Sequence, residues 1–296
     1  MLNLLSPGLG LQRLGERSAY LFLLISPALL LATIAYYALV PRLNFTGYAV
    51  SSLLPLGVYL LAIVATMAMS WRKSREQSVA PPWWSRWYSL VGTYLAVSLV
   101  GFLLVEVAHK YYKPFYLPSE AMAPTLLPND RLIASMDGPG ELSRGDVILF
   151  DVGDLVYIKR VAALPGDRIE LIDGVVHINN RAVASRRIGT ERLPFESFPG
   201  PIGEIVTRLA EQFPGETAPH QIYDMGPGPS DDFPAVTVPA GHVFVLGDNR
   251  DQSADSRISR TEWGVEMLPL TDVRGHALFY TWGPSARMGE PIVAPR

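Results

Sequence analysis

The sequence predicts three N-terminal transmembrane α-helices followed by a mostly-β domain that carries an inserted small subdomain. Three uncharged apolar runs, 18–40, 48–71 and 87–105, fill most of the first third of the chain. From Phe115 onward, short runs of β-branched and apolar residues alternate with Gly, Pro and Asp, which is typical of short strands joined by tight turns. Between about residues 183 and 239 the sequence is polar and rich in Pro and Gly, which indicates the inserted subdomain.

Each apolar run is long enough to cross a membrane. At a rise of about 1.5 Å per residue, helices of this length span a hydrocarbon core of about 30 Å. We expect spans at about 18–40, 48–71 and 87–108. Three buried helices of a globular protein are the alternative, but uncharged runs of this length are rare in soluble folds. The first run does not fit a cleaved signal peptide, because it is too long and no small-x-small site follows it.

Basic residues are concentrated on one side of the predicted spans. That side, before the first span and between the second and third, holds Arg13, Arg17, Arg72, Lys73, Arg75 and Arg86. The opposite side holds Arg42, Lys110 and Lys113. Because basic residues are retained on the cytoplasmic side, we expect residues 1–17 inside the cell and residues 109–296 outside. Tryptophans at the inner boundaries of the spans agree with this orientation, since amphipathic rings favour the interface.

The part of the chain from residue 109 to residue 296 is expected to form the β-rich domain. The apolar runs predict strands at Arg131–Ala134, Asp146–Phe150, Leu155–Val161, Arg168–Ile172, Val175–Ile178, His242–Leu246 and Ala277–Trp282. Within the proposed insertion, 183–239, one short helix is expected near Ile205–Phe213.

The composition excludes several classes of function. The chain has 296 residues and a formal net charge of −3, so nothing indicates a nucleic-acid partner. It contains no cysteine, which excludes disulfides, thiolate zinc sites and a cysteine nucleophile. The histidines are scattered and show no metal-ligand spacing. No metal or other cofactor is expected.

Three segments of the β-rich domain carry candidate chemistry, and below they are called the first, second and third motifs. They are residues 118–126 (PSEAMAPTL), 157–161 (YIKRV) and 247–257 (GDNRDQSADSR). In a strand, Tyr157, Lys159 and Val161 share one face, so the lysine would lie between an aromatic and a β-branched neighbour. Burial there would lower the lysine pKa and let the amine act as a base. A surface lysine whose stem covers apolar area is the alternative.

Together the three motifs resemble those of the bacterial type I (leader) signal peptidases, which are membrane-bound Ser/Lys proteases. In that family the residue before the Met of the first motif is the serine nucleophile, and in this chain that residue is Ala121. The resemblance implies that Lys159 is the general base and that Ser253 orients it. It also implies that Ser119 and the Ala121 N–H form the oxyanion hole.

The resemblance assigns supporting roles to further residues of the motifs. Asp255 and Arg257 correspond to a structural ion pair that supports the site. The turn of the same motif corresponds to Asp248, Asn249 and Arg250. Tyr157 supports Lys159, and Met122 and Pro124 are expected beside the substrate. A milder departure than Ala121 is Ala163, where the family often has glycine before Leu-Pro-Gly-Asp.

Two interpretations of Ala121 are open. It is either an engineered substitution that stops cleavage or the mark of a natural pseudoenzyme. Because the other site residues are retained, engineering is favoured. Ser119 is a poor substitute nucleophile, since its side chain is expected to point in a different direction from that of residue 121. In either case the chain should be nearly inert.

The resemblance implies that the native form removes signal peptides from exported preproteins, at the outer face of the bacterial cytoplasmic membrane. Its partners would be signal peptides and membrane lipid. A specialised signal-peptidase-like protease for conjugation or for one secretion substrate is an alternative. A non-catalytic binder of signal peptides is another. The self-cleaving repressors share the Ser/Lys pair but lack membrane spans and the third motif.

Overall fold

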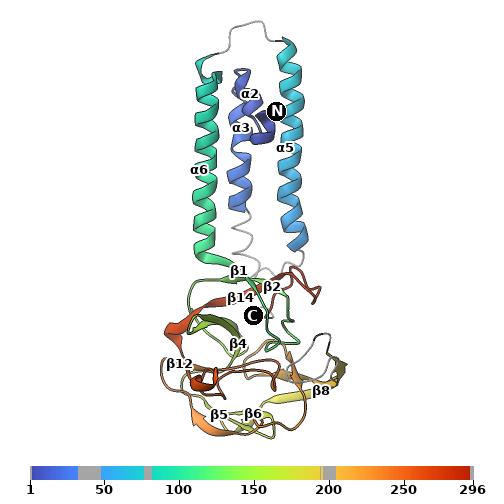
Figure 1. The fold of residues 1–296 in the computed structure, drawn as a ribbon, viewed down its shortest axis with the longest axis vertical. Coiled ribbons are helices and arrows are strands. Elements are labelled where there is room, and N and C mark those ends of the chain that lie inside the picture. Colours follow the sequence, from blue (N-terminus) through green and yellow to red (C-terminus); the bar gives the residue numbers. More distant parts are fainter. Residues whose placement is uncertain (1, 33–47, 77–81, 194, 196–204, 294–296) are drawn as a thin grey trace. The chain divides into compact units, whose positions relative to one another are not determined.

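The computed structural model describes residues 2–32, 48–76, 82–193, 195 and 205–293, and in 48–54 it describes the backbone only. The chain divides into a helical unit that ends at Lys110 and a β-rich unit that begins at Tyr111. Each unit has its own packing, and each is considered separately (Figure 1).

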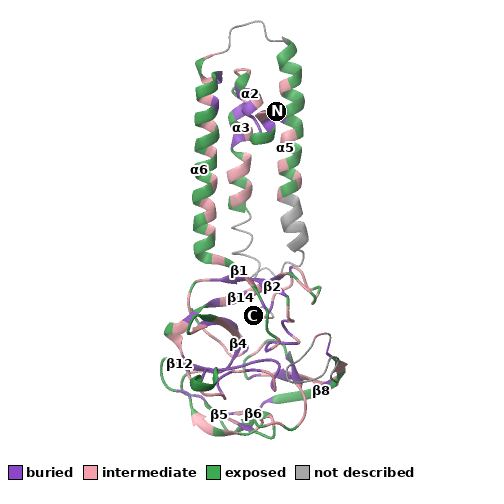
Figure 2. Cartoon of the chain, viewed as in Figure 1, coloured by how far each residue is buried: buried purple, intermediate pink, exposed green. Residues whose placement is uncertain are grey.

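The helical unit contains two long apolar helices, α5 (Tyr48–Glu76) and α6 (Trp87–Tyr111). Both are long and apolar enough to cross a membrane, by length and composition, over Pro55–Arg75 and Trp87–Tyr111. Most of their side chains are exposed within the unit (Figure 2). The first predicted span is described only as the shorter apolar helix Ala19–Ala32, and residues 33–40 lie outside the described residues.

Short helices at the N-terminus pack between α5 and α6 (Figure 1). They are α1 (Leu2–Leu5), α2 (Leu9–Arg13) and α3 (Ala19–Leu23), and a short 3₁₀ helix, η1 (Trp83–Ser85), precedes α6. Leu9, Leu23 and Leu90 form a small apolar cluster that joins α2, α3 and α6. This arrangement of the first residues was not predicted from the sequence.

The β-rich unit is built on three antiparallel sheets. The largest has the strand order β1-β2-β14-β3-β4-β12-β13, a second the order β11-β5-β6-β7, and a third the order β10-β9-β8. The strands of the largest sheet are β1 (Tyr112–Tyr116), β2 (Arg131–Ser135), β3 (Val147–Val152), β4 (Leu155–Ala163), β12 (His242–Leu246), β13 (Leu268–Pro269) and β14 (Val273–Trp282). Those of the other two are β5 (Arg168–Ile172), β6 (Val175–Ile178), β7 (Arg181–Ala182), β8 (Ala184–Arg192), β9 (Ile205–Gln212), β10 (His220–Asp224) and β11 (Phe233–Thr237).

The mostly-β prediction is confirmed, and the expected strands are present with ends shifted by a few residues. The helix expected near Ile205–Phe213 is wrong, because this segment is strand β9. It lies in the middle of its sheet, where β8 and β10 pair with its backbone on both sides. Pairing along both edges satisfies the backbone groups that a helix would have bonded internally, and it overrides a weak helical pattern. Within 183–239, β8 to β10 form a separate sheet, whereas β11 returns to β5.

Candidate functional site

The second and third motifs lie on adjacent strands. Strand β4 carries the second motif, and the third motif begins directly after β12, its antiparallel neighbour. Leu246 pairs with Arg160 at the end of this ladder. In an antiparallel pair the next residues across are therefore Gly247 and Lys159.

The first motif forms a turn that is bonded to the third motif. Ala121 is buried, and its carbonyl oxygen accepts a 3.1 Å hydrogen bond from the backbone N–H of Asn249. The Asn249 side chain lies 3.4 Å from the carbonyl oxygen of Glu120. These contacts bring together two segments that are more than a hundred residues apart in sequence.

Gly247 is the point at which the three motifs meet. A Cβ atom added to Gly247 would lie 2.1 Å from the Ser253 hydroxyl oxygen and 2.5 Å from the Ala121 carbonyl oxygen. No side chain fits in this space, so glycine is required for the close approach. The Ser253 hydroxyl is buried and has no hydrogen-bond partner among the described residues. Ala121, Ser253 and, by strand register, Lys159 therefore surround one glycine.

Lys159 has the setting that was expected of it. Its side chain is almost fully buried, at 4% exposure. Burial lowers its pKa from 10.5 to about 8, with the positive charge of Arg257 adding to the effect and Asp255 and Asp248 opposing it. The amine lies 5.7 Å from the ring centroid of Tyr157, which confirms that these two side chains share a face. The alternative of a surface lysine is wrong.

Ser119 lies at the exposed edge of the first motif. Its hydroxyl oxygen accepts a 3.1 Å hydrogen bond from the backbone N–H of Ala121. The two groups expected to form an oxyanion hole are therefore neighbours, and in this state they bond to each other.

Asp255 and Arg257 form a buried, two-pronged ion pair, with both Arg257 Nε and Nη2 at 2.9 Å from the carboxylate. Burial alone would raise the pKa of Asp255, but Arg257 holds it below its usual value. The same carboxylate accepts the N–H of Gly247 at 3.0 Å. The pair therefore positions the glycine on which the site converges.

A second buried ion pair, which was not expected from the sequence, joins all three motifs. Arg160 donates to Asp248 at 2.8 and 2.6 Å and to the Thr125 hydroxyl at 3.2 Å. Thr125 in turn donates to Asp248, and the Tyr280 hydroxyl donates to the Thr125 carbonyl oxygen. Although burial would raise the pKa of Asp248, Arg160 lowers it, so the pair stays ionised. The signal was available, since Arg160 directly follows Lys159 and must point to the opposite face of β4.

Arg250 belongs to a further network that sequence reasoning missed. Its guanidinium donates to Glu211 of β9, and Glu211 also contacts His220, which bonds to Glu216. Despite its burial, Glu211 has a pKa lowered to about 2, by Arg250 and then by His220. The network attaches the three-stranded sheet to the third motif. No local pattern marks these residues, because their partners come from separate elements.

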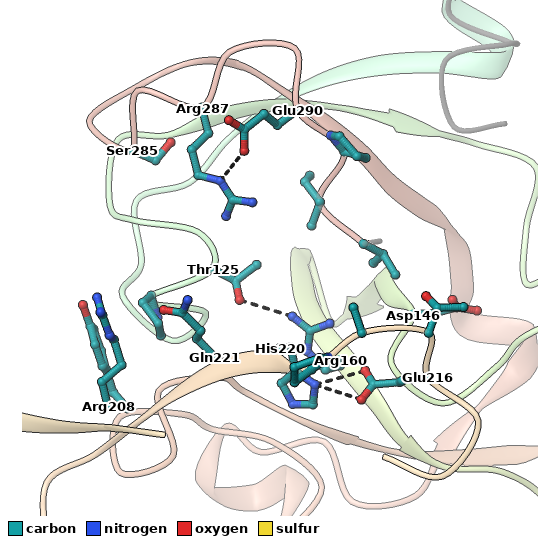
Figure 3. A pocket seen from close by; sticks show the side chains of 18 of the residues that line it. Thr125, Asp146, Arg160, Arg208, Glu216, His220, Gln221, Ser285, Arg287 and Glu290 are labelled. Atoms are coloured by element: carbon teal, nitrogen blue, oxygen red, sulfur yellow. Dashed lines mark hydrogen bonds and ion pairs between the residues drawn. The ribbon is translucent and has the colours of Figure 1, made fainter. Parts of the chain in front are cut away.

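A polar cavity of about 620 Å³ lies beside the first motif, and Pro124 and Thr125 form part of its wall (Figure 3). Arg160, Glu216 and His220 line its floor, and Arg287 pairs with Glu290 across from them. Met122, by contrast, is buried in a core cluster with Leu117 and Leu126 and lines no open surface. Of the two residues expected beside the substrate, only Pro124 faces a cavity.

The described residues include no group of three or more His, Asp or Glu side chains that could hold a metal ion.

Comparisons with known proteins place the chain in a family. Residues 84–282, more than half of the chain, match the family model described as signal peptidase, peptidase S26. A protein named probable signal peptidase I-1 from Synechocystis is 31% identical over 210 residues, covering 66% of this chain and 83% of the relative. Signal peptidase I of Rickettsia akari is 31% identical over 206 residues, covering 58% and 71%. A crystal structure of a signal peptidase I from Enterococcus faecalis matches with 22% identity and a TM-score of 0.26, covering 46% of this chain and 96% of that one. With a family match over most of the β-rich unit and relatives of this identity and coverage, the chain belongs to the type I signal peptidases.

Proposed function

We propose that this chain has the architecture of a membrane-bound Ser/Lys endopeptidase that removes N-terminal signal peptides from exported preproteins. We further propose that Ala121 leaves it without the nucleophile. The observation that carries both statements is the convergence on Gly247, where the Ala121 carbonyl and the Ser253 hydroxyl meet opposite Lys159. Every expected component of the site is present there except a hydroxyl on residue 121.

Lys159 is suited to the role of general base. With a pKa of about 8, a substantial fraction of its amine is neutral near physiological pH, whereas an exposed lysine would be almost fully protonated. Tyr157 and the buried strand surface exclude water from one side of the amine. Ser253, whose buried hydroxyl has no other described partner, is proposed to orient the amine.

With a serine at position 121, the reaction would proceed in two steps. The Lys159 amine takes the proton of the serine hydroxyl while its oxygen bonds to the scissile carbonyl carbon. The proton passes to the leaving amine, and a water activated by the lysine then hydrolyses the acyl-enzyme. The Ala121 N–H and the Ser119 hydroxyl would stabilise the oxyanion, which would replace their mutual hydrogen bond.

The chain with alanine at position 121 should be nearly inactive. In another serine protease, loss of the nucleophile alone costs on the order of a million-fold in turnover. Because Lys159, Ser253, Asp255 and Arg257 all keep their places, the structure favours a single substitution in a complete site over gradual decay. This supports an engineered or very recent change over a long-established pseudoenzyme.

The proposed location is the bacterial cytoplasmic membrane, with the β-rich unit on the outer side. Two apolar helices of sufficient length, α5 and α6, support a membrane anchor, and the excess of basic residues before α3 and between α5 and α6 supports the orientation. A third span at 18–40 remains part of this proposal.

The proposed substrates are the signal peptides of exported preproteins, in line with the names of the relatives. We expect the peptide to bind as an extended strand beside the first and second motifs, with small side chains at the first and third positions before the cut. Backbone pairing would supply most of the affinity, and shallow pockets the selectivity.

The test is restoration of activity. The Ala121→Ser variant, in detergent or lipid, should cleave preproteins after small residues, and Lys159→Ala on that background should abolish cleavage again. If the folded Ala121→Ser protein leaves several preproteins uncut, the assignment of the Ser/Lys pair is wrong. Cleavage that persists without Lys159 would also refute the assignment of the base.

A further inference from the structure

The main chain of Gly247, where the three motifs meet, is held on both sides by buried charged side chains. Glycine has more backbone freedom than any other residue, and that freedom must be removed if the motifs are to keep their places. The Gly247 N–H donates to the Asp255 carboxylate at 3.0 Å. On the other side, Nε of Arg250 donates to the Gly247 carbonyl oxygen at 3.3 Å. A residue that fixes Arg250 therefore acts on the centre of the site.

Glu211, from strand β9 of the three-stranded sheet, fixes Arg250. Both terminal nitrogens of the guanidinium donate to the Glu211 carboxylate, with Nη1 at 3.1 Å from its oxygen. Arg250 is 6% exposed and Glu211 is 2% exposed, so water cannot readily replace either partner. Because the guanidinium is planar, holding both terminal nitrogens leaves the Nε–H with one direction, toward Gly247.

The Glu211 carboxylate is in turn held by His220 of β10. The two residues lie directly opposite each other in the antiparallel ladder, and Nε2 of His220 is 3.2 Å from the carboxylate. The other ring nitrogen, Nδ1, is 3.0 Å from the Glu216 carboxylate (Figure 3). The Phe213 ring packs against the imidazole, with the ring centroids 4.8 Å apart. The imidazole is therefore fixed from three directions.

The three-stranded sheet also contacts the third motif through its main chain. The N–H of Tyr223, on β10, donates to the Asp248 carbonyl oxygen at 2.8 Å, and the Tyr223 carbonyl oxygen accepts the Arg250 N–H at 3.1 Å. These two bonds place β10 alongside the third motif at Asn249. Arg250 is therefore held by the same sheet at its backbone and at its side chain.

We propose that Glu211 is a positioning residue for the peptidase reaction, acting through Arg250 on the main chain of Gly247. His220 supports this role because it fixes the Glu211 carboxylate. The three-stranded sheet thereby becomes part of the catalytic architecture, although none of its residues belongs to the three motifs. The inference rests on the proposed function.

The first experiment measures cleavage in the Ala121→Ser background. Glu211→Gln keeps the size of the side chain but removes its charge and one acceptor for Arg250. The value of kcat per folded molecule should fall about tenfold, the effect of losing one hydrogen bond between charged groups. KM should stay within about twofold, because the peptide is proposed to pair with the first and second motifs. Near-ultraviolet circular dichroism gives the folded fraction by which kcat is corrected.

A second variant keeps the test open if Glu211→Gln does not fold. His220→Gln leaves the Glu211–Arg250 pair in place and removes one contact to the carboxylate. In this variant kcat per folded molecule should fall about threefold, again with little change in KM. An unchanged kcat in both variants would overturn the proposal.

Two controls separate positioning from simple attachment of the sheet. Glu191→Gln removes the same charge from β8, where the carboxylate pairs with Arg208 at 2.8 Å and both side chains are about a third exposed. Its kcat should stay within about twofold, and a loss equal to that of Glu211→Gln would overturn the proposal. Arg250→Lys keeps a cation opposite Glu211 but has no Nε–H held by a planar fork. Its kcat should fall as far as in Glu211→Gln, and full activity would show that attachment alone is sufficient.

Hydrogen exchange in the chain with Ala121 tests the positioning without any cleavage. Glu211→Gln should speed exchange of the Gly247 amide about tenfold. The Val161 amide, buried in β4 and bonded to the Asp146 carbonyl oxygen at 2.8 Å, should change within about twofold. Equal acceleration at both amides would indicate a general loss of stability and would overturn the proposal.

Failure of this inference is distinguishable from failure of the proposed function. If the Ala121→Ser protein leaves preproteins uncut but exchange at Gly247 responds to Glu211→Gln as expected, the proposed function is wrong and the structural link stands. If the Ala121→Ser protein cleaves preproteins but Glu211→Gln alters neither kcat nor exchange at Gly247, only the positioning role is wrong.

Discussion

The backbone N–H of Asn249 donates a 3.1 Å hydrogen bond to the carbonyl oxygen of Ala121. This bond ties the turn that carries the proposed nucleophile position to the loop that carries Ser253. It also fixes the direction of the Ala121 carbonyl, against which Gly247 packs. The position of residue 121 therefore depends on main-chain contacts, which a change of its side chain leaves intact.

Gly247→Ala, introduced into the Ala121→Ser background, should abolish cleavage. The new methyl group would clash with the Ser253 hydroxyl and the Ala121 carbonyl and would push the two motifs apart. Overpacking of this kind costs about 1–3 kcal/mol of stability, so the protein should still fold. Initial cleavage rates test whether activity is lost, and near-ultraviolet circular dichroism tests whether the protein is still folded.

Gly101→Ala in α6 is the control for that change. A Cβ atom there meets nothing within 4 Å, so activity should remain as in the Ala121→Ser protein. Full activity in the Gly247→Ala protein would mean that the site is not assembled around this glycine.

The pH dependence of the Ala121→Ser enzyme should report Lys159. If the neutral amine is the base, as proposed, kcat/KM should rise about tenfold per pH unit below a pKa of about 8 and level off above it. The negative charge of Asp255 makes the largest contribution that raises the pKa of Lys159. Because Asp255→Asn removes this charge, the pH midpoint of any remaining activity should be lower. An unchanged midpoint would show that another group controls the rate.

The same lysine should make stability depend on pH. Its pKa is about 8 in the folded chain and 10.5 in the unfolded one, so between these values the unfolded state holds a proton that the folded state has lost. Stability should therefore rise as the pH increases from about 8 to 10.5, apart from other titrations. In the Lys159→Met variant this rise in the free energy of unfolding with pH should be absent. Denaturant titrations repeated across this pH range measure it.

Arg160→Met should destabilise the β-rich unit strongly. It leaves the Asp248 carboxylate, 1% exposed, without its cation in the interior, and removal of one partner of such a pair costs about 3–5 kcal/mol. Guanidinium titration of the full chain in detergent, followed by near-ultraviolet circular dichroism, measures the change.

Arg274→Met is the matched control for Arg160→Met. Arg274 pairs with Asp151 at 2.7 Å, but both side chains are about 40% exposed, so the loss should stay below about 1 kcal/mol. Similar losses in the two variants would mean that burial does not set the importance of the Arg160–Asp248 pair.

The proposed orientation makes a prediction about fusions. A reporter that is active only outside the cytoplasm should work when fused after Arg296 and fail when fused near Gln77. The excess of basic residues between α5 and α6 is the physical reason, since such segments are retained inside. The opposite pattern would contradict the orientation.

Much of the fold could be predicted because it depends on local pattern. The alternation of apolar and polar residues predicted strands such as β5 and β6 with their observed ends, and the length of the apolar runs predicted α5 and α6. The segment of β9 could not be assigned in this way. Its apolar residues fit a helix as well as a strand, and the choice depended on pairing with β8 and β10, which lie outside the segment itself.

The candidate site, too, could be predicted from the sequence only in part. Its residue types, including the alanine at position 121, were legible in the three motifs, and so was the expectation that Asp255 pairs with Arg257. The partners of Arg160 and Arg250 were not, because each bond joins residues that lie far apart in the chain. A motif states which groups are present, but not which of them face each other.

The sequence by itself determined the chemical groups of this protein, the apolar lengths of its helices and the absence of a hydroxyl at residue 121. Only the tertiary structure decided that Lys159 is buried and that Gly247 lies against Ala121 and Ser253. The physical reason is that desolvation and hydrogen bonding depend on which segments pack around a group. A lysine with a pKa of about 8 is thus a property of the packed sheets and not of the lysine alone.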